Sequence, residues 1–176
     1  MLSHIDDLAW AYLTVNVSKY SSAGTLLHKY TIVNFMKNGV DEMYEYDGSL
    51  LEKSVYLNGK LHGETFRNGR IKSKKQYVNG MLNGRSITYI GDNEKDFKEL
   101  CYYKNDILHG KCISYNRKIN HKFVVHYING NEHGQCKIYK NGLLVSLTTY
   151  VNGIAHGEYF NLERGERGRY VYGLKK

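Results

Sequence analysis

Tyr56-Leu57-Asn58-Gly59-Lys60-Leu61-His62-Gly63 is the first of five related segments in this chain of 176 residues. In the third segment, Asp106 stands where the others have their first glycine. The leading tyrosines follow one another after 21, 26, 24 and 23 residues. Self-similarity at such a period indicates that each copy is one supersecondary unit. The later segments are Tyr77-Val78-Asn79-Gly80-Met81-Leu82-Asn83-Gly84, Tyr103-Lys104-Asn105-Asp106-Ile107-Leu108-His109-Gly110, Tyr127-Ile128-Asn129-Gly130-Asn131-Glu132-His133-Gly134 and Tyr150-Val151-Asn152-Gly153-Ile154-Ala155-His156-Gly157.

The Asn-Gly pair, present in four of the five segments, predicts a β-hairpin. A type I′ turn needs a positive φ at both central residues, and Asn-Gly adopts this conformation at low steric cost. The flanks, as in 122–128 and 143–151, are rich in strand-forming Val, Ile, Leu, Thr and Tyr. We therefore expect a meander of about a dozen short antiparallel strands between roughly residues 27 and 174. Weaker signals of the same kind lie at 35–39, 46–48, 66–69, 89–93 and 139–142.

The second glycine of each segment falls inside a predicted strand. Glycine weakens a strand unless another group must approach the backbone closely. Because an aromatic residue repeats together with this glycine, we expect a neighbouring Tyr or Phe ring to lie over each glycine. The five positions are Gly63, Gly84, Gly110, Gly134 and Gly157.

With the motif Y-x-N-G-x-x-H-G at a period near 23, roughly residues 30–174 resemble the MORN repeat in a short, degenerate form. The resemblance implies an all-β fold, an elongated single-layer antiparallel β-meander of stacked hairpins. It also implies use in protein contacts, self-association or attachment near membranes. Asn83 in place of His, Asp106 in place of Gly and an insertion at 90–96 depart from the pattern. Such arrays are common in large DNA viruses, so a viral origin is compatible with the resemblance.

The ends of such an array are edge strands, which need protection from unwanted pairing. At the N-terminus, Ser3-His4-Ile5-Asp6 fits a capping box, and apolar residues follow at helical spacing. We predict a short helix over residues 4–13, which we interpret as a cap rather than as a partner-binding helix. Alternation of Leu13, Val15 and Val17 predicts a first strand. The predicted organisation is an N-terminal cap over 1–26 and a hairpin repeat array over 27–176.

The four repeat histidines, His62, His109, His133 and His156, have the residue type of metal ligands but the wrong spacing. Equivalent positions in successive hairpins lie about 10 Å apart, whereas each ligand of one zinc ion lies about 2 Å from it. We expect each His to bond a backbone carbonyl or a Tyr hydroxyl of the adjacent hairpin. No nucleotide-binding or hydrolase motif occurs. Because the repeats use nearly the whole chain, we predict no enzyme, no catalytic residue, no metal, no cofactor and no small-molecule substrate.

The three cysteines, Cys101, Cys112 and Cys136, cannot all pair within the chain and show no C-x-x-C spacing. Cys112 and Cys136 occupy equivalent repeat positions, so we expect about 10 Å between them, beyond disulfide reach. In a symmetric hairpin Cys101 would pair near Gly110 and not with Cys112. The sequence therefore predicts free thiols in a reducing compartment.

The formal charge of +8 is unevenly distributed, near −3 over residues 1–50 and near +11 beyond them, which points to an anionic partner. The densest basic cluster is interleaved with Phe66 and Tyr77. A solvated sheet face is the favoured interpretation, followed by anionic lipid headgroups and then nucleic acid, for which no recognition signature is present. The cluster, a candidate anion- or lipid-binding site, comprises Arg67, Arg70, Lys72, Lys74 and Lys75.

The leading hypothesis is a non-enzymatic repeat scaffold that mediates protein–protein interaction or self-association, such as a homodimer, through one face of the sheet. A structural component of a large viral particle or its assembly machinery is one form of it. The alternative is peripheral binding to anionic membrane lipids through the basic face. No apolar run suits a membrane-spanning helix, and Asp6 and Asp7 stand where a signal peptide is basic. We therefore expect a soluble, intracellular, cytoplasmic protein, free or associated with a virion or membrane.

Overall fold

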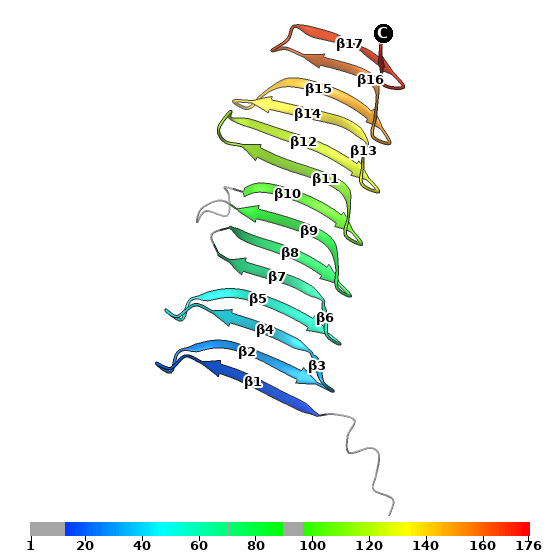
Figure 1. The fold of residues 1–176 in the computed structure, drawn as a ribbon. Helices are drawn as coiled ribbons and strands as arrows, with labels where there is room; N and C mark the ends of the chain where they lie inside the picture. The colour runs from blue at the N-terminus through cyan, green and yellow to red at the C-terminus, as the bar shows by residue number, and fades with distance from the viewer. Residues whose placement is uncertain (1–12, 70, 90–96) are drawn as a thin grey trace, which may run out of the picture. The chain divides into compact units, whose positions relative to one another are not determined.

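The computed structural model describes residues 13–69, 71–89 and 97–176, whose strands are drawn in Figure 1. The described residues form strands and turns without any helix, so the predicted all-β class is confirmed. Apart from Leu13, the predicted helix over residues 4–13 lies outside them. The strands are β1 (Thr14–Tyr20), β2 (Leu26–Val33), β3 (Met36–Lys37), β4 (Gly39–Tyr44), β5 (Leu50–Leu57), β6 (Lys60–Leu61), β7 (Gly63–Asn68), β8 (Lys72–Val78), β9 (Met81–Tyr89), β10 (Phe97–Lys104), β11 (Ile107–Asn116), β12 (His121–Ile128), β13 (Asn131–Glu132), β14 (Gly134–Lys140), β15 (Leu143–Val151), β16 (Ile154–Asn161), β17 (Glu166–Val171) and β18 (Leu174–Lys175).

The chain divides into two compact units. One holds Met1–Arg70 and Tyr77–Met81, and the other holds Ile71–Gln76 and Leu82–Lys176. In the first unit β1 pairs with β2, β2 with β3 and β4, β4 with β5, and β5 with β6 and β7. In the second unit β9 to β12 pair in chain order, β12 pairs with both β13 and β14, and β14 to β18 again pair in chain order.

All these pairings are antiparallel, so each unit is an open sheet built as a meander of hairpins, as predicted. β1 contains the predicted first strand around Val15 and Val17. The predicted boundary at residue 26 stays a prediction, and β1 on one side of it pairs with β2 on the other.

The predicted two-residue turns are confirmed by their backbone angles. Asn129 has a φ of 51° and Gly130 one of 82°, the pair of positive values that a type I′ turn requires. The same holds at the four other repeat turns, including the one where Asp106 replaces glycine and adopts a φ of 65°.

The second glycine of the repeat lies in a β-bulge of the returning strand. In the hairpin of β15 and β16, Tyr150 pairs with Ala155 and Thr148 pairs with Tyr159. One residue, Thr149, therefore faces the three residues 156–158, so the returning strand carries two extra residues. Gly157, in the middle of them, has a φ of +105°, a conformation that residues with a Cβ rarely adopt.

The predicted aromatic ring over this glycine is wrong. The residue that faces the bulge glycine is the one before the motif tyrosine, which is Val55 at Gly63, Gln76 at Gly84 and Thr149 at Gly157. Only Gly110 has an aromatic neighbour, Tyr102, and there the closest atom is Cβ. At Gly134 no atom lies within 4 Å of an added Cβ. Glycine repeats because the bulge needs a positive φ, which all five positions have.

The structure also corrects the position of the turn before the five segments. The sequence suggested a turn at Asn38-Gly39, by analogy with the Asn-Gly pairs downstream. Instead, Asn34 and Phe35 form the turn, with φ values of 50° and 64°, and Gly39 is the bulge glycine, with a φ of 86°. Residues 32–39 are thus another copy of the repeat, and Tyr172-Gly173, with φ values of 48° and 81°, forms the turn of a last one.

The sheets bury little. Among the described residues only Ile87, Tyr89 and Cys101 are buried hydrophobic side chains. Asp41, a buried acid, is satisfied by His28, whose Nε2 lies 2.6 Å from Oδ1, and by an ion pair with Lys37. A single layer has no second surface to pack against, so its stability must come from strand pairing, turns and half-buried side chains.

Candidate functional site

At three of its four positions, the repeat histidine connects one hairpin turn to the next. Its ring Nδ1 accepts a hydrogen bond from the backbone N–H of the first residue of the following turn. In addition, the N–H of the second turn residue donates to the preceding hairpin, as Gly130 does to the carbonyl of Leu108 at 2.9 Å. The N···N distances are 3.5 Å for His62 and Asn79, 3.5 Å for His109 and Asn129, and 3.4 Å for His156 and Tyr172.

The prediction for these histidines was right about the adjacent hairpin and wrong about the partner, which is a backbone amide. Where Asn83 replaces His, its side-chain amide donates to Asn105 Oδ1 at 2.9 Å, so the link between turns is kept. His133 occupies the same place, but its buried Nδ1 has no hydrogen-bond partner within the described residues. These side chains link successive turns. Among the described residues, none of them belongs to a group of three side chains that could hold a metal ion.

Alternation along the strands gives the second unit two different faces. Through the register of β10 to β17, the motif tyrosines all project from one side, which we call the tyrosine face. Burial raises the pKa of Tyr103, Tyr127 and Tyr150, and the rings of Tyr159 and Tyr170 lie 4.6 Å apart. This face is half-buried although no second layer of described residues covers it within the unit.

The opposite side carries lysines, and we call it the lysine face. A groove of about 350 Å³ lies on it over β11, β12 and β14. Lys122 lies 5.4 Å from the ring centroid of Tyr139 and 5.9 Å from that of Tyr115, a cation–π arrangement. No described acidic residue lines the groove, which makes it a concentration of positive charge. Its lining residues are Lys111, Lys122, Val124, His126, Gln135, Lys137 and Tyr139.

In a second groove, in the first unit, two lysines share one carboxylate. Lys29 Nζ lies 2.7 Å from one carboxylate oxygen of Glu42, and Lys53 Nζ lies 3.0 Å from the other. Hydrogen bonds from Lys29 and then Lys53 lower the pKa of Glu42 from 4.5 to about 2. In this groove, of about 430 Å³, both lysines already have a carboxylate partner, unlike the lysines of the first groove, which no described acid lines.

The lysines of the predicted basic cluster lie on both faces of β8. Arg67 lies in the first unit, 3.9 Å from the carboxylate of Glu52. Lys72, Lys74 and Lys75 lie in β8, where alternation places Lys75 on the face opposite to the other two. Arg70 lies outside the described residues. The lysine groove of β11, β12 and β14 was missed because its members are spread over residues 111–139, and only strand register brings them together.

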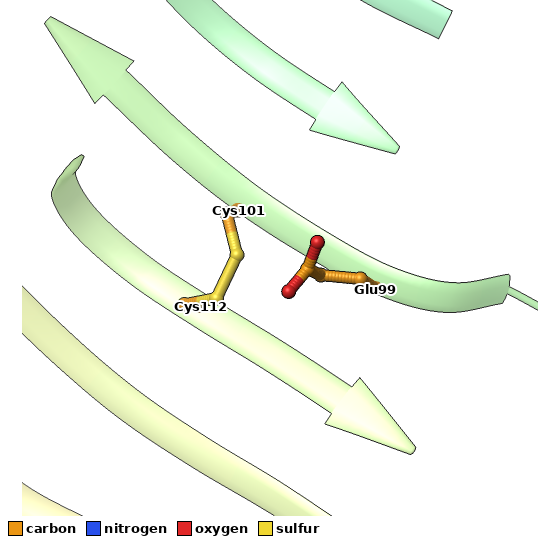
Figure 2. A group of neighbouring side chains, drawn as sticks. All are labelled: Glu99, Cys101 and Cys112. Atoms are coloured by element: carbon orange, nitrogen blue, oxygen red, sulfur yellow. A yellow bond between two sulfur atoms is a disulfide. The ribbon is translucent and has the colours of Figure 1, made fainter. Parts of the chain in front are cut away.

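Cys101 and Cys112 form a disulfide, so the prediction of three free thiols is wrong for these two. They are direct register partners on β10 and β11, with a Cα–Cα distance of 4.0 Å, and Figure 2 shows the bridge between the strands. The symmetric hairpin that would pair Cys101 near Gly110 fails because the bulge adds two residues to β11. Cys136 stays free, and burial raises the pKa of its thiol, which makes it a poor nucleophile.

Glu99 lies beside the disulfide, two residues before Cys101 on the same face of β10 (Figure 2). One carboxylate oxygen and the two sulfurs all lie within 4.8 Å of one another. This is the one group of at least three metal-ligating side chains that the described residues bring together. Sequence spacing did not reveal it, since the donors come from two strands whose register depends on the bulge.

Comparison with models of protein families and with curated proteins finds no match to this chain. Within the described residues, no helix has the length and apolar character that crossing a membrane requires.

Proposed function

We propose that this protein is a non-enzymatic repeat scaffold that binds a protein partner, or a second copy of itself, through the tyrosine face. The observation that carries the proposal is the half-buried state of this face, which the described residues of its unit cover with no second layer. Its tyrosines are Tyr103, Tyr127, Tyr150, Tyr159 and Tyr170. Contiguous apolar and aromatic surface of this kind commonly marks an interaction site.

The repeat geometry supports assigning the chain to the MORN-like class. Among the described residues, seven repeat turns share the positive φ pair, which Asn141-Gly142 also has. The bulge glycine and the turn-linking side chain recur along both units. The implied use in contacts and self-association belongs to this proposal, and so does a role in a large viral particle, which rests on the sequence alone.

A matched pair of variants tests the proposal. Thr148 lies on the tyrosine face, in register with Cys136 and Tyr159, whereas Gln135 lies on the lysine face. We expect Thr148→Lys to abolish self-association in sedimentation velocity, or to abolish binding of a protein partner that the wild type captures. We expect Gln135→Lys to keep the same binding activity as the wild type. A wild-type chain that neither self-associates nor captures a protein sensitive to Thr148→Lys refutes the proposal.

Peripheral binding to anionic lipid is a second candidate function, and the lysine groove is the observation that favours it. Lys111, Lys122 and Lys137 converge there without a lining acid among the described residues. Acidic headgroups attract such clusters with about 1 kcal/mol per basic residue near the surface.

Co-sedimentation with phosphatidylserine vesicles separates the two functions. Lipid binding through this groove predicts that Lys122→Gln weakens sedimentation, that Gln135→Lys strengthens it and that salt reverses it. If sedimentation is absent, or unchanged in both variants, the lipid function is wrong, and the result for Thr148→Lys is unaffected.

A further inference from the structure

We propose that the reduced form of this protein binds a thiophilic divalent cation, with Zn²⁺ as the best fit, at Cys101, Cys112 and Glu99. The proposal rests on the juxtaposition in Figure 2, where two sulfurs and a carboxylate from β10 and β11 lie within 4.8 Å of one another. The group lies on the tyrosine face, since Glu99, Cys101 and Tyr103 are alternate residues along β10, but the proposal uses none of the tyrosines.

The donor set suits zinc. Thiolates select zinc among the common cellular divalent ions, and a carboxylate completes three protein ligands, which leaves a fourth tetrahedral position for water. The distances also suit it. Two thiolates bound to one zinc lie about 3.8 Å apart, as follows from Zn–S distances of about 2.3 Å and tetrahedral angles. Cys101 and Cys112 face each other at a Cα–Cα distance of 4.0 Å, so rotation about their Cα–Cβ bonds opens the required gap without moving the strands.

Positively charged side chains near the group complement the charge of its ligands. Cys101 is only 2% exposed, whereas Glu99 is exposed and lines a surface hollow of about 700 Å³. Two thiolates, one carboxylate and a divalent cation carry one net negative charge. Lys98 and Lys118 line the same hollow and complement that charge.

Disulfide and metal exclude each other, because each thiolate needs the electron pair that the S–S bond uses. Reduction by a water-soluble phosphine breaks the S–S bond and oxidises the phosphine by two electrons. Water supplies the oxygen of the phosphine oxide and the protons of the two thiols. The cation then displaces one proton from each thiol, so binding is linked both to the redox state and to pH.

Cobalt(II) is the probe, because thiolate ligation gives charge-transfer absorption and a tetrahedral site gives strong visible bands. The protein is reduced with the phosphine, freed of it without oxygen and titrated with cobalt chloride, then with zinc chloride. We expect one cobalt per chain, displaced by zinc, and no thiolate–cobalt absorption in the disulfide form. Alkylation with iodoacetamide, read by mass spectrometry, should show zinc protecting Cys101 and Cys112 but not Cys136.

Variants assign the ligands. Cys101→Ser and Cys112→Ser should lose the absorption, and Cys136→Ser, the matched control, should keep it. Glu99→Gln changes an exposed side chain, so it tests the carboxylate without disturbing the sheet. We expect it to weaken cobalt binding by at least about tenfold, the lower limit for losing even an outer-sphere partner.

Three results overturn the proposal: a reduced wild type without thiolate–cobalt absorption, binding that the disulfide form shows equally, or binding that needs Cys136. If the cobalt affinity of Glu99→Gln equals that of the wild type, Glu99 is not a ligand and the three-ligand site is wrong. If a cysteine variant unfolds, the alkylation pattern of the wild type and the titration of Glu99→Gln still decide the outcome.

Discussion

The bulge glycines allow a direct test of what the repeat requires, with three alanine variants that differ in one property each. Gly134 has a φ of +78° and no atom within 4 Å of an added Cβ. Gly157 has a φ of +105° and the Cβ of Thr149 at 3.3 Å. Gly69 has neither a left-handed φ nor a neighbour within 4 Å. Alanine therefore meets backbone strain alone at position 134, strain and a close contact at position 157, and neither at position 69.

The magnitudes follow from these differences. A residue with a Cβ in the left-handed region costs about 1–2 kcal/mol, and alanine recovers about 0.4–1 kcal/mol by restricting the unfolded chain. Gly134→Ala should thus lower the free energy of unfolding by about 1 kcal/mol. In Gly157→Ala the contact with Thr149 adds an overpacking cost of about 1 kcal/mol or more. Gly69→Ala should be neutral or slightly stabilising.

Thermal unfolding followed by circular dichroism measures the three effects, with urea unfolding as a second readout. At about 2–4 °C per kcal/mol for a chain of this size, Gly134→Ala should melt about 2–4 °C below the wild type. Gly157→Ala should fall by about twice as much. If Gly134→Ala has the same melting temperature as Gly69→Ala, the positive φ is not the reason for glycine at this position. If Gly134→Ala and Gly157→Ala melt together, the contact with Thr149 costs nothing.

Three further substitutions test the turn, the ion network and the link between turns. Phe35→Gly should raise the free energy of unfolding, measured in urea, by about 0.5–1 kcal/mol. Phe35 is 85% exposed and holds a φ of 64° at a position where the other repeats favour glycine. Equal or lower stability would contradict this explanation. Glu42→Gln should destabilise at neutral pH, with a difference that disappears as the pH falls from about 4.5 to about 2, since a depressed carboxyl pKa stabilises only above that range; a constant difference would show that charge is not the cause. His109→Ala should cost about 0.5–1.5 kcal/mol by leaving the N–H of Asn129 without its acceptor, and His109→Asn should recover part of the loss, as measured by urea midpoints.

Much of the fold was predictable because the Asn-Gly turn is a local signal. The φ values of Asn129 and Gly130 depend on those two residues and on the strands beside them, so the sequence was enough to predict the hairpins and the meander. Asn38-Gly39 shows the limit of this reasoning. The same dipeptide forms a bulge there, because the turn four residues earlier, at Asn34 and Phe35, already sets the register.

The sites were less predictable, since they depend on register. Pairing Cys101 with Cys112, rather than near Gly110, follows from two extra residues in β11, which no count from the turn reveals. The lysine groove has the same cause: Lys122 and Lys137 meet through pairing of β12 with β14, after the bulge at Gly134. Sequence reasoning could have found both sites only by recognising the His-Gly pair as a bulge signal.

The size of the bulge explains how the two faces stay distinct through successive repeats. Side chains alternate with a period of two, so one extra residue in a returning strand would move every later side chain to the other face. The bulge adds two, as the change from Tyr150 with Ala155 to Thr148 with Tyr159 shows, and the alternation continues in phase. The motif tyrosines therefore keep to one side and the lysines of the groove to the other. The two-residue bulge, which requires a glycine with a positive φ, thus keeps the aromatic surface and the basic surface on opposite sides of the sheet. Each surface can therefore be tested by its own substitutions.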